Sequence, residues 1–154
     1  MQDIALFVIT LIVIIIFFKL LIILHSRRKR KRLLRSSMRE IDIMNGCLFE
    51  EYLEILFKNQ GYKVKSTPSH NDFGADLIIT KGNDKKAVQV KRTKNKVGIK
   101  AVQEVVASVK FYDCNSASVM TNNYFTKSAI KLAAKNDVEL LDRDILMKKI
   151  SKVI

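Results

Sequence analysis

In the predicted hairpin "GADLIITKGNDKKAVQVKR", the polar residues Asp76, Gln89 and Lys91 stand directly beside the apolar residues of the two strands. Side chains alternate across a strand, so Gln89 and Lys91 share one face of their strand while the apolar residues between and around them serve the core. With a turn centred near Asn83 and Asp84, antiparallel pairing places Asp76 opposite residue 91, to within one or two residues. An acid, an amide and an amine are therefore expected to converge at one edge of a sheet.

This combination of groups suits phosphodiester hydrolysis. The Asp76 carboxylate can hold Mg²⁺, which prefers oxygen ligands, and the Gln89 amide and the Val90 carbonyl offer weaker oxygens. The metal polarises the phosphate and its water, while the Lys91 ammonium orients or deprotonates that water and offsets negative charge. We expect Mg²⁺ as the cofactor, with Mn²⁺ as the alternative. The competing reading is a solvated Asp76–Lys91 ion pair, which is the commoner arrangement when such a pair is taken alone.

The elements that must position these residues follow from hydrophobic periodicity. An amphipathic helix comes first, with Ile43 and Cys47 on its apolar face and Gly61 as its stop signal. Thr126 and Asp142 are expected to cap later helices. After the first helix the pattern predicts a strand at 62–66, the two hairpin strands, a helix at 99–112, a strand at 116–121, a helix at 125–136, a strand at 138–141 and a helix at 142–150. Three adjacent strands followed by strand-helix alternation predict an α/β fold with a mixed central sheet and helices on both faces.

The N-terminal segment has a different composition. Residues 4–24 contain 19 apolar residues among 21, and a helix of that length reaches about 31 Å, close to the thickness of the bilayer hydrocarbon. Seven of the nine residues at 27–35 are Lys or Arg, which places this flank in the cytoplasm. A cleaved signal peptide is the alternative, but its apolar region would be shorter. We expect a transmembrane helix at 4–24, a basic linker at 25–42 and a cytoplasmic domain at 43–154, held at the cell membrane by a single pass.

Five segments of the chain together resemble a known family. "NDFGAD", followed after twelve residues by "QVK", is similar to the D-x-G-x-D and Q-x-K motifs of the Mrr-type restriction endonuclease domain, a branch of the PD-(D/E)xK nuclease superfamily. The segments "GCLFEEYLEILFKNQGYKV", "GIKAVQEV", "TNNYFTKSAIKLA" and "VELLDRDIL" match further parts of that domain, and the resemblance covers about residues 44–147. It implies a restriction-endonuclease-like fold and a Mg²⁺-dependent DNA endonuclease of type IV restriction character, acting on foreign or modified DNA.

The resemblance also implies roles for individual residues. Asp76 matches the metal-binding acid and Lys91 the catalytic lysine, while Gln89 stands where the wider superfamily has Glu or Asp. Glu50 matches an additional acid in the first helix, although a solvated helix carboxylate beside its acidic neighbours is an equal alternative.

Three further positions match the family pattern. Asp72 corresponds to the first acid of D-x-G-x-D and could instead cap its loop. Gln103 corresponds to a polar position of the next helix and could equally be an ordinary exposed side chain. Gly74 is expected to serve the backbone turn.

Positive charge surrounds the proposed site. Residues 36–154 contain 20 Lys or Arg against 14 Asp or Glu, a net charge of +6. Residues 85–100 hold seven basic residues and no acid, which suits contacts to a phosphate backbone, although a solvated basic loop would have the same composition. The candidate DNA-binding residues are Lys85, Lys86, Arg92, Lys94, Lys96 and Lys100.

Two function classes remain open on the sequence alone. The first is a DNA endonuclease, with RNA or branched DNA as alternative substrates. The second is a binding module of the same fold, with a weak or inactive site, that tethers DNA or a protein complex at the membrane. No separate target-recognition domain is visible, which predicts low sequence selectivity, a homodimer or a partner recognition subunit.

Overall fold

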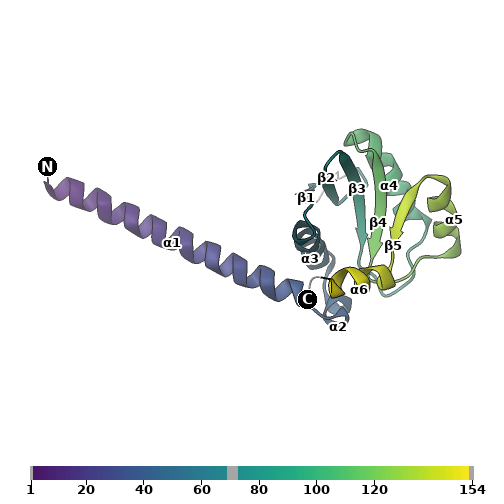
Figure 1. Ribbon diagram of the computed structural model, residues 1–154, viewed down its shortest axis with the longest axis horizontal. Helices are drawn as coiled ribbons and strands as arrows, with labels where there is room; N and C mark the ends of the chain where they lie inside the picture. Colours follow the sequence, from purple (N-terminus) through teal and green to yellow (C-terminus); the bar gives the residue numbers. More distant parts are fainter. Residues whose placement is uncertain (1, 69–72, 153–154) are drawn as a thin grey trace. The chain divides into compact units, whose positions relative to one another are not determined.

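The computed structural model describes residues 2–68 and 73–152 and divides the chain into two compact units, Met1–Arg35 and Ser36–Ile154 (Figure 1). The first unit is the helix α1 (Gln2–Leu34). Within it, Leu6–Leu34 is long enough, and over an 18-residue stretch apolar enough, to cross a membrane by length and composition. The Thr10 hydroxyl donates to the carbonyls of Leu6 and Phe7, at 3.1 and 2.8 Å, so its polar group is satisfied inside the helix.

The helix α1 does not end where the apolar sequence ends. It continues ten residues past Leu24 and carries most of the basic cluster on helical backbone. The expected linker at 25–42 is thus largely helical. Its last residues belong to the second unit, which begins at Ser36, seven residues before the expected boundary at residue 43.

The second unit is built around a five-stranded mixed sheet in the order β1-β2-β3-β4-β5. The first three strands pair antiparallel and the last three pair parallel, which confirms the expected α/β architecture. The predicted N-caps Thr126 and Asp142 are also confirmed. The strands are β1 (Lys63–Ser66), β2 (Leu77–Lys81), β3 (Asp84–Lys91), β4 (Ser116–Thr121) and β5 (Val138–Leu141). The helices are α2 (Met38–Ile43), α3 (Gly46–Asn59), α4 (Ile99–Phe111), α5 (Lys127–Lys135) and α6 (Arg143–Ser151).

Helices cover both faces of the sheet (Figure 1). On one face, Ile78 and Ala87 pack with Val102 and Val105 of α4 in a buried cluster that α5 extends through Ala129. On the strands β2 and β3 the residues that alternate with this set are buried as well, and α3 packs against these strands. Because β3 is covered on both sides over its buried residues 87–90, a polar side chain within this stretch requires a specific partner.

The first helix of the domain begins later than expected. Asn45 caps α3 by accepting a hydrogen bond from Leu48 N at 2.8 Å, and the backbone at Met44 is extended. Ile43 is therefore 82% exposed at the end of α2, and Cys47 is exposed in the first turn of α3. The prediction that both lie on the apolar face was wrong, because one unbroken helical period was assumed across this break.

The short helix α2 is part of the domain through its last turn. Ile41 is completely buried, and Asp42 forms a bidentate ion pair with Arg143 at 2.7 and 2.8 Å. Asp42 also accepts a hydrogen bond from Asn122 at 2.9 Å. This ion pair ties α2 to the start of α6, 101 residues further along the chain.

The Asp42–Arg143 pair makes the stability of the domain sensitive to acid. The hydrogen bonds from Arg143 are the largest cause that lowers the pKa of Asp42 below its ordinary value of 3.8. A carboxyl with a lower pKa in the folded state stabilises the fold fully above its unfolded pKa and loses that contribution as the pH falls through the folded pKa. We expect Asp42→Asn to lower the melting temperature by a few degrees at pH 7, since the pair is partly exposed, and the gap to close below pH 3.8.

Thermal unfolding of the full chain in detergent, followed by circular dichroism from pH 7 to pH 3, measures this gap. Asp137→Asn is the matched control, because it removes a carboxylate at a left-handed turn position that Asn adopts readily. A gap for Asp42→Asn that stays constant over the whole pH range would contradict the linkage.

Candidate active site

The predicted acid, Asp76, and the predicted amide, Gln89, meet at one end of the inner strands β2 and β3. Asp76 lies directly before β2, and its Oδ2 accepts hydrogen bonds from Gln89 Nε2 and, at 2.6 Å, from the main-chain N–H of Val90. Gln89 is only 3% exposed. The one buried polar side chain of β3 is thus satisfied by this carboxylate, and the contact fixes the position of both groups.

The register of the hairpin differs from the expected one by two residues. The turn consists of Gly82 and Asn83, since Lys81 pairs with Asp84, and Leu77 pairs with Val88. Asp76 lies just before this ladder, and its main-chain N–H donates to the Val88 carbonyl at 2.9 Å, so it lies beside Val88 and Gln89 rather than opposite residue 91. The two-residue turn is possible because Gly82 adopts a positive φ of 60°, so the turn is tighter than the "KGND" stretch suggested.

Lys91 lies on the same face of β3 as Gln89, two residues further along. Its Nζ is 2.9 Å from Glu104 Oε2 of α4, and Glu104 Oε1 is 3.9 Å from Lys100 Nζ. Glu104 was not among the predicted site residues. A signal for it exists in the sequence, because it is the only acidic residue between Asp84 and Asp113.

Gly74 explains how the loop before β2 is held in place. Its φ is +93°, and a Cβ at this position would lie 2.1 Å from the main-chain oxygen of Glu104. The backbone that leads to Asp76 therefore crosses directly over the turn of α4 that carries the partner of Lys91. This agrees with the backbone role expected for Gly74.

The remaining candidate residues occupy different surroundings. Glu50 lies half-buried in α3, which packs against β1, β2 and β3. Gln103 is exposed on α4, next to Glu104. Asp72 lies outside the described residues. For these three positions the catalytic role stays a prediction.

The basic residues of the 85–100 segment fall into two groups. Lys85 and Lys86 lie at the hairpin end of β3, about 17 to 20 Å along the strand from Lys91. Lys85 Nζ donates to the Tyr112 carbonyl at 2.5 Å, and Lys86 Nζ pairs with Glu139 at 2.7 Å. Both side chains therefore form contacts within the domain, at the end of β3 that lies away from Asp76.

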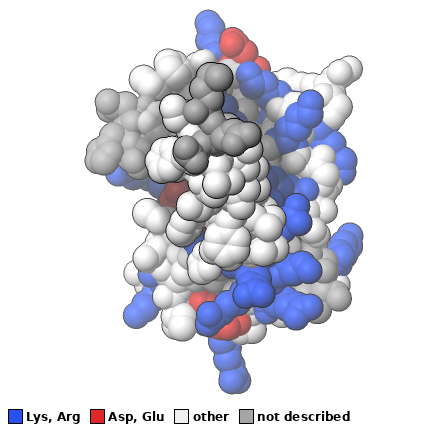
Figure 2. Space-filling model, turned by 90° about the vertical axis from the view of Figure 1, so that its left-hand side faces the viewer, with Lys and Arg blue, Asp and Glu red and all other residues white. Residues whose placement is uncertain are grey.

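The second group lies past the end of β3, near the proposed site. Lys94, Lys96 and Lys100 are exposed, while Arg92 is half-buried and donates to the Asp42 carbonyl at 3.3 Å. Lys and Arg side chains also cover much more of the face seen in Figure 2 than Asp and Glu side chains do. An excess of basic side chains suits a polyanion, and Lys94, Lys96 and Lys100 are the exposed basic residues of the segment that follows β3.

A polar network supports the end of β3. The Thr121 hydroxyl donates to the Lys91 carbonyl at 2.6 Å, and Asn122 Oδ1 accepts from Thr93 N at 2.8 Å. Thr121 and Asn122 are buried and belong to the "TNNYFT" segment, whose supporting role was not predicted. Beside them lies a cavity of about 330 Å³ lined by Asp42, Thr93, Lys94, Asn122, Asn123, Tyr124 and Arg143.

The donor set can be tested against a divalent metal. Within residues 2–68 and 73–152 there is no group of three or more His, Cys, Asp or Glu side chains that could hold a metal ion. Mg²⁺, however, commonly takes only one or two carboxylates and completes its shell with water and substrate phosphate. Asp76 beside the Gln89 amide fits such a partial set of hard oxygen ligands.

Comparisons with known proteins concern the family and the fold of this domain. Residues 41–150 match the family model Mrr_cat, described as restriction endonuclease. No curated protein matches the chain. Among solved structures, the DNA modification-dependent restriction endonuclease AspBHI is similar at a TM-score of 0.58 and 17% identity, over 82% of this chain and 36% of that one. A protein of unknown function, AF1548, is similar at a TM-score of 0.56 and 16% identity, over 68% of this chain and 62% of that one.

A third solved structure is the MspJI restriction endonuclease in complex with a 27-mer oligonucleotide, at a TM-score of 0.46 and 18% identity, over 66% of this chain and 26% of that one. This chain spans less than two thirds of each of the three solved chains. The structural likeness therefore supports the fold alone, and it does not assign the activities of those larger proteins to this chain.

Proposed function

The chain belongs to the Mrr_cat restriction endonuclease family, and from this premise we propose that it is a Mg²⁺-dependent endodeoxyribonuclease that hydrolyses phosphodiester bonds at the Asp76–Gln89–Lys91 site. The observation that carries the proposal is the buried contact between Asp76 and Gln89, with Lys91 on the same face of β3. A carboxylate, a buried amide and an ammonium that gather at one strand end form a cluster of the kind found at functional sites.

Each residue of the site would have a separate role in phosphodiester hydrolysis. Asp76, the Gln89 amide oxygen and the Val90 carbonyl would hold the cation, with Gln89 turning its amide to present Oε1 in place of Nε2. When bound, the cation polarises the scissile phosphate and activates a water. As an ammonium, Lys91 would orient that water and offset charge on the phosphate; as a neutral amine, it would instead accept a proton from the water. Glu104, 2.9 Å from Lys91, would hold the ammonium in position.

We also propose a cellular location, a substrate and partners for this protein. The helix α1 would anchor the protein in the cell membrane with the nuclease domain in the cytoplasm, because the basic cluster follows the apolar segment. Foreign or modified DNA would be the substrate, in the manner of type IV restriction. One site cuts one strand at a time, so two copies would be needed to break both strands together, while a partner recognition subunit would supply target selection.

Plasmid cleavage tests the proposal directly. The purified full chain in detergent is incubated with supercoiled plasmid, methylated or not, in the presence of Mg²⁺, Mn²⁺ or a chelator. We expect relaxed or linear product with a divalent cation and none with the chelator. DNA that is bound but left intact under all these conditions would instead favour the binding module.

Glu104→Gln provides a narrower test of the arrangement around Lys91. Glutamine keeps the size and one hydrogen-bond acceptor but removes the charge that pairs with the ammonium at 2.9 Å. We expect the cleavage rate to fall about tenfold while DNA affinity is kept, a smaller loss than removal of Lys91 itself. Single-turnover cleavage at saturating enzyme separates the two quantities. A variant with the wild-type rate would show that the pair is not used in positioning Lys91.

A further inference from the structure

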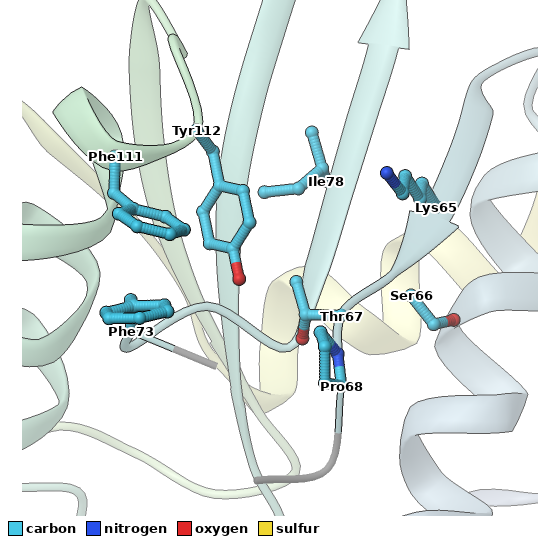
Figure 3. A pocket seen from close by; sticks show the side chains of 8 residues that line it. All are labelled: Lys65, Ser66, Thr67, Pro68, Phe73, Ile78, Phe111 and Tyr112. Carbon is cyan, nitrogen blue, oxygen red and sulfur yellow. The ribbon is translucent and has the colours of Figure 1, made fainter. Parts of the chain in front are cut away.

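A second candidate binding site lies on the sheet face that carries Asp76. It is a cavity of about 560 Å³, within the range of about 300–1,000 Å³ typical of ligand pockets. Its wall comes from β1, β2, the loop segments around them and the last turn of α4 (Figure 3). The lining residues are Lys65, Ser66, Thr67, Pro68, Phe73, Ile78, Phe111 and Tyr112.

Aromatic rings dominate one side of this cavity. Phe73 and Phe111 stack with ring centroids 3.8 Å apart, and Tyr112 meets Phe111 edge to face at 4.9 Å (Figure 3). Phe73 is 53% exposed and Phe111 is 55% exposed. Two large rings that are half accessible and held rigid by each other offer a flat surface to another flat group.

The cavity is connected to the proposed active site through the backbone. The Thr67 hydroxyl donates to the carbonyls of Ala75 and Asp76, at 2.6 and 3.0 Å. Ile78 follows Asp76 by two residues on the same strand face, a separation of about 7 Å. Phe73, one of the stacked rings, precedes Asp76 by three residues, at most about 11 Å along the chain, so a ligand seated on the rings would lie within a few nucleotides of a phosphate held at Asp76.

The residues that line the cavity indicate the kind of ligand that fits it. Lys65 supplies a cation at the rim, opposite the aromatic rings (Figure 3). Aromatic faces with a nearby cation are the common means of binding single-stranded nucleic acid, because every base has a π-face. In an intact duplex the base faces are covered by stacked neighbours, so only an unstacked base can make this contact.

We propose that this aromatic pocket, formed by Lys65, Thr67, Phe73, Ile78, Phe111 and Tyr112, binds an unpaired nucleobase adjacent to the scissile phosphate. The inference rests on the proposed nuclease function and specifies its substrate class. DNA with a mismatch, gap or flap supplies such a base at least cost, because the unstacking has already occurred. The enzyme is therefore selective for locally single-stranded DNA.

Binding to fluorescent oligonucleotides tests this proposal without reference to cleavage. The full chain in detergent is titrated, with a chelator present, against duplexes that carry one 2-aminopurine, either paired or placed at a one-nucleotide gap. Stacking on a ring quenches this base, and anisotropy gives the affinity. We expect quenching and about tenfold tighter binding for the unpaired base.

Variants of Phe111 identify the pocket as the cause. Phe111 ends α4 with its ring half exposed, so Phe111→Ala is compatible with folding. We expect this variant to lose both the quenching and the tenfold preference, and Phe111→Tyr to keep them. Ile130→Ala, which removes a 52% exposed apolar side chain from α5, is the matched control and should behave as wild type.

The two proposals fail in different ways. The base-binding pocket would be overturned if duplexes with the paired and the unpaired base bind with equal affinity, or if the preference survives in Phe111→Ala. Either result would leave the proposed nuclease function intact. A pocket that is occupied by a partner protein instead would give the same results. Absence of binding to any DNA, together with absence of plasmid cleavage, would overturn both.

Discussion

Asp76→Ala and Lys91→Ala should each abolish plasmid cleavage, with a loss of at least about 100-fold. Asp76 accepts the Gln89 amide and the Val90 N–H, so its removal deprives a cation of its one carboxylate and leaves two buried donors without this acceptor. Lys91 is the ammonium on the same strand face, and alanine removes both its charge and its proton-transfer capacity. The measurement is the initial rate of conversion of supercoiled to relaxed plasmid.

The affinity of these variants for DNA separates chemistry from binding. Lys91→Ala removes one charge from a strongly basic domain and should weaken binding only slightly. Lys86→Ala is the matched control, since it removes a lysine from the same strand at the opposite edge, where it pairs with Glu139. If Lys86→Ala reduces cleavage as much as Lys91→Ala, charge rather than position explains the effect and the catalytic assignment of Lys91 fails.

The contact between Asp76 and Gln89 shows what the sequence could predict about the site. Alternation along β3 was enough to place Gln89 and Lys91 on one face, because that rule depends only on the strand. The exact register was not predictable, since it depends on whether the turn uses two residues or more, and the positive φ at Gly82 decides this. The partner of Lys91 came from a helix, and helix-to-strand contacts do not follow from periodicity.

The fold was predictable to the level of element order and sheet type, for a similar reason. Strong apolar periods specify the strands and α4, whereas α2 is a short polar helix held by long-range contacts. Its Asp42–Arg143 ion pair joins residues 101 positions apart, and no local pattern encodes such a pair. The misplacement of Ile43 and Cys47 has the same origin, since the extended backbone at Met44 interrupts a pattern that looks continuous.

Gly74→Ala should produce the largest loss of stability among the glycine variants. The new Cβ would lie 2.1 Å from the Glu104 main-chain oxygen, and the φ of +93° is strained for any L side chain. Backbone atoms on both sides must move apart, and we expect a destabilisation of about 3 kcal/mol or more. Because Gly74 lies two residues before Asp76, and Glu104 pairs with Lys91, the same movement separates the acid from the ammonium.

Two other glycines separate the causes. Gly82→Ala meets a positive φ of 60° but has no atom within 4 Å, so we expect a cost of about 1 kcal/mol. Gly46→Ala, in the first turn of α3, meets neither constraint and should change the free energy of unfolding by less than about 0.5 kcal/mol. Chemical denaturation of the full chain in detergent gives all three values. An equal loss of stability in Gly74→Ala and Gly82→Ala would mean that the loop before β2 does not pack tightly against α4. The packing that we assign to the site would then be wrong, because Asp76 and Lys91 depend on that contact for their relative position.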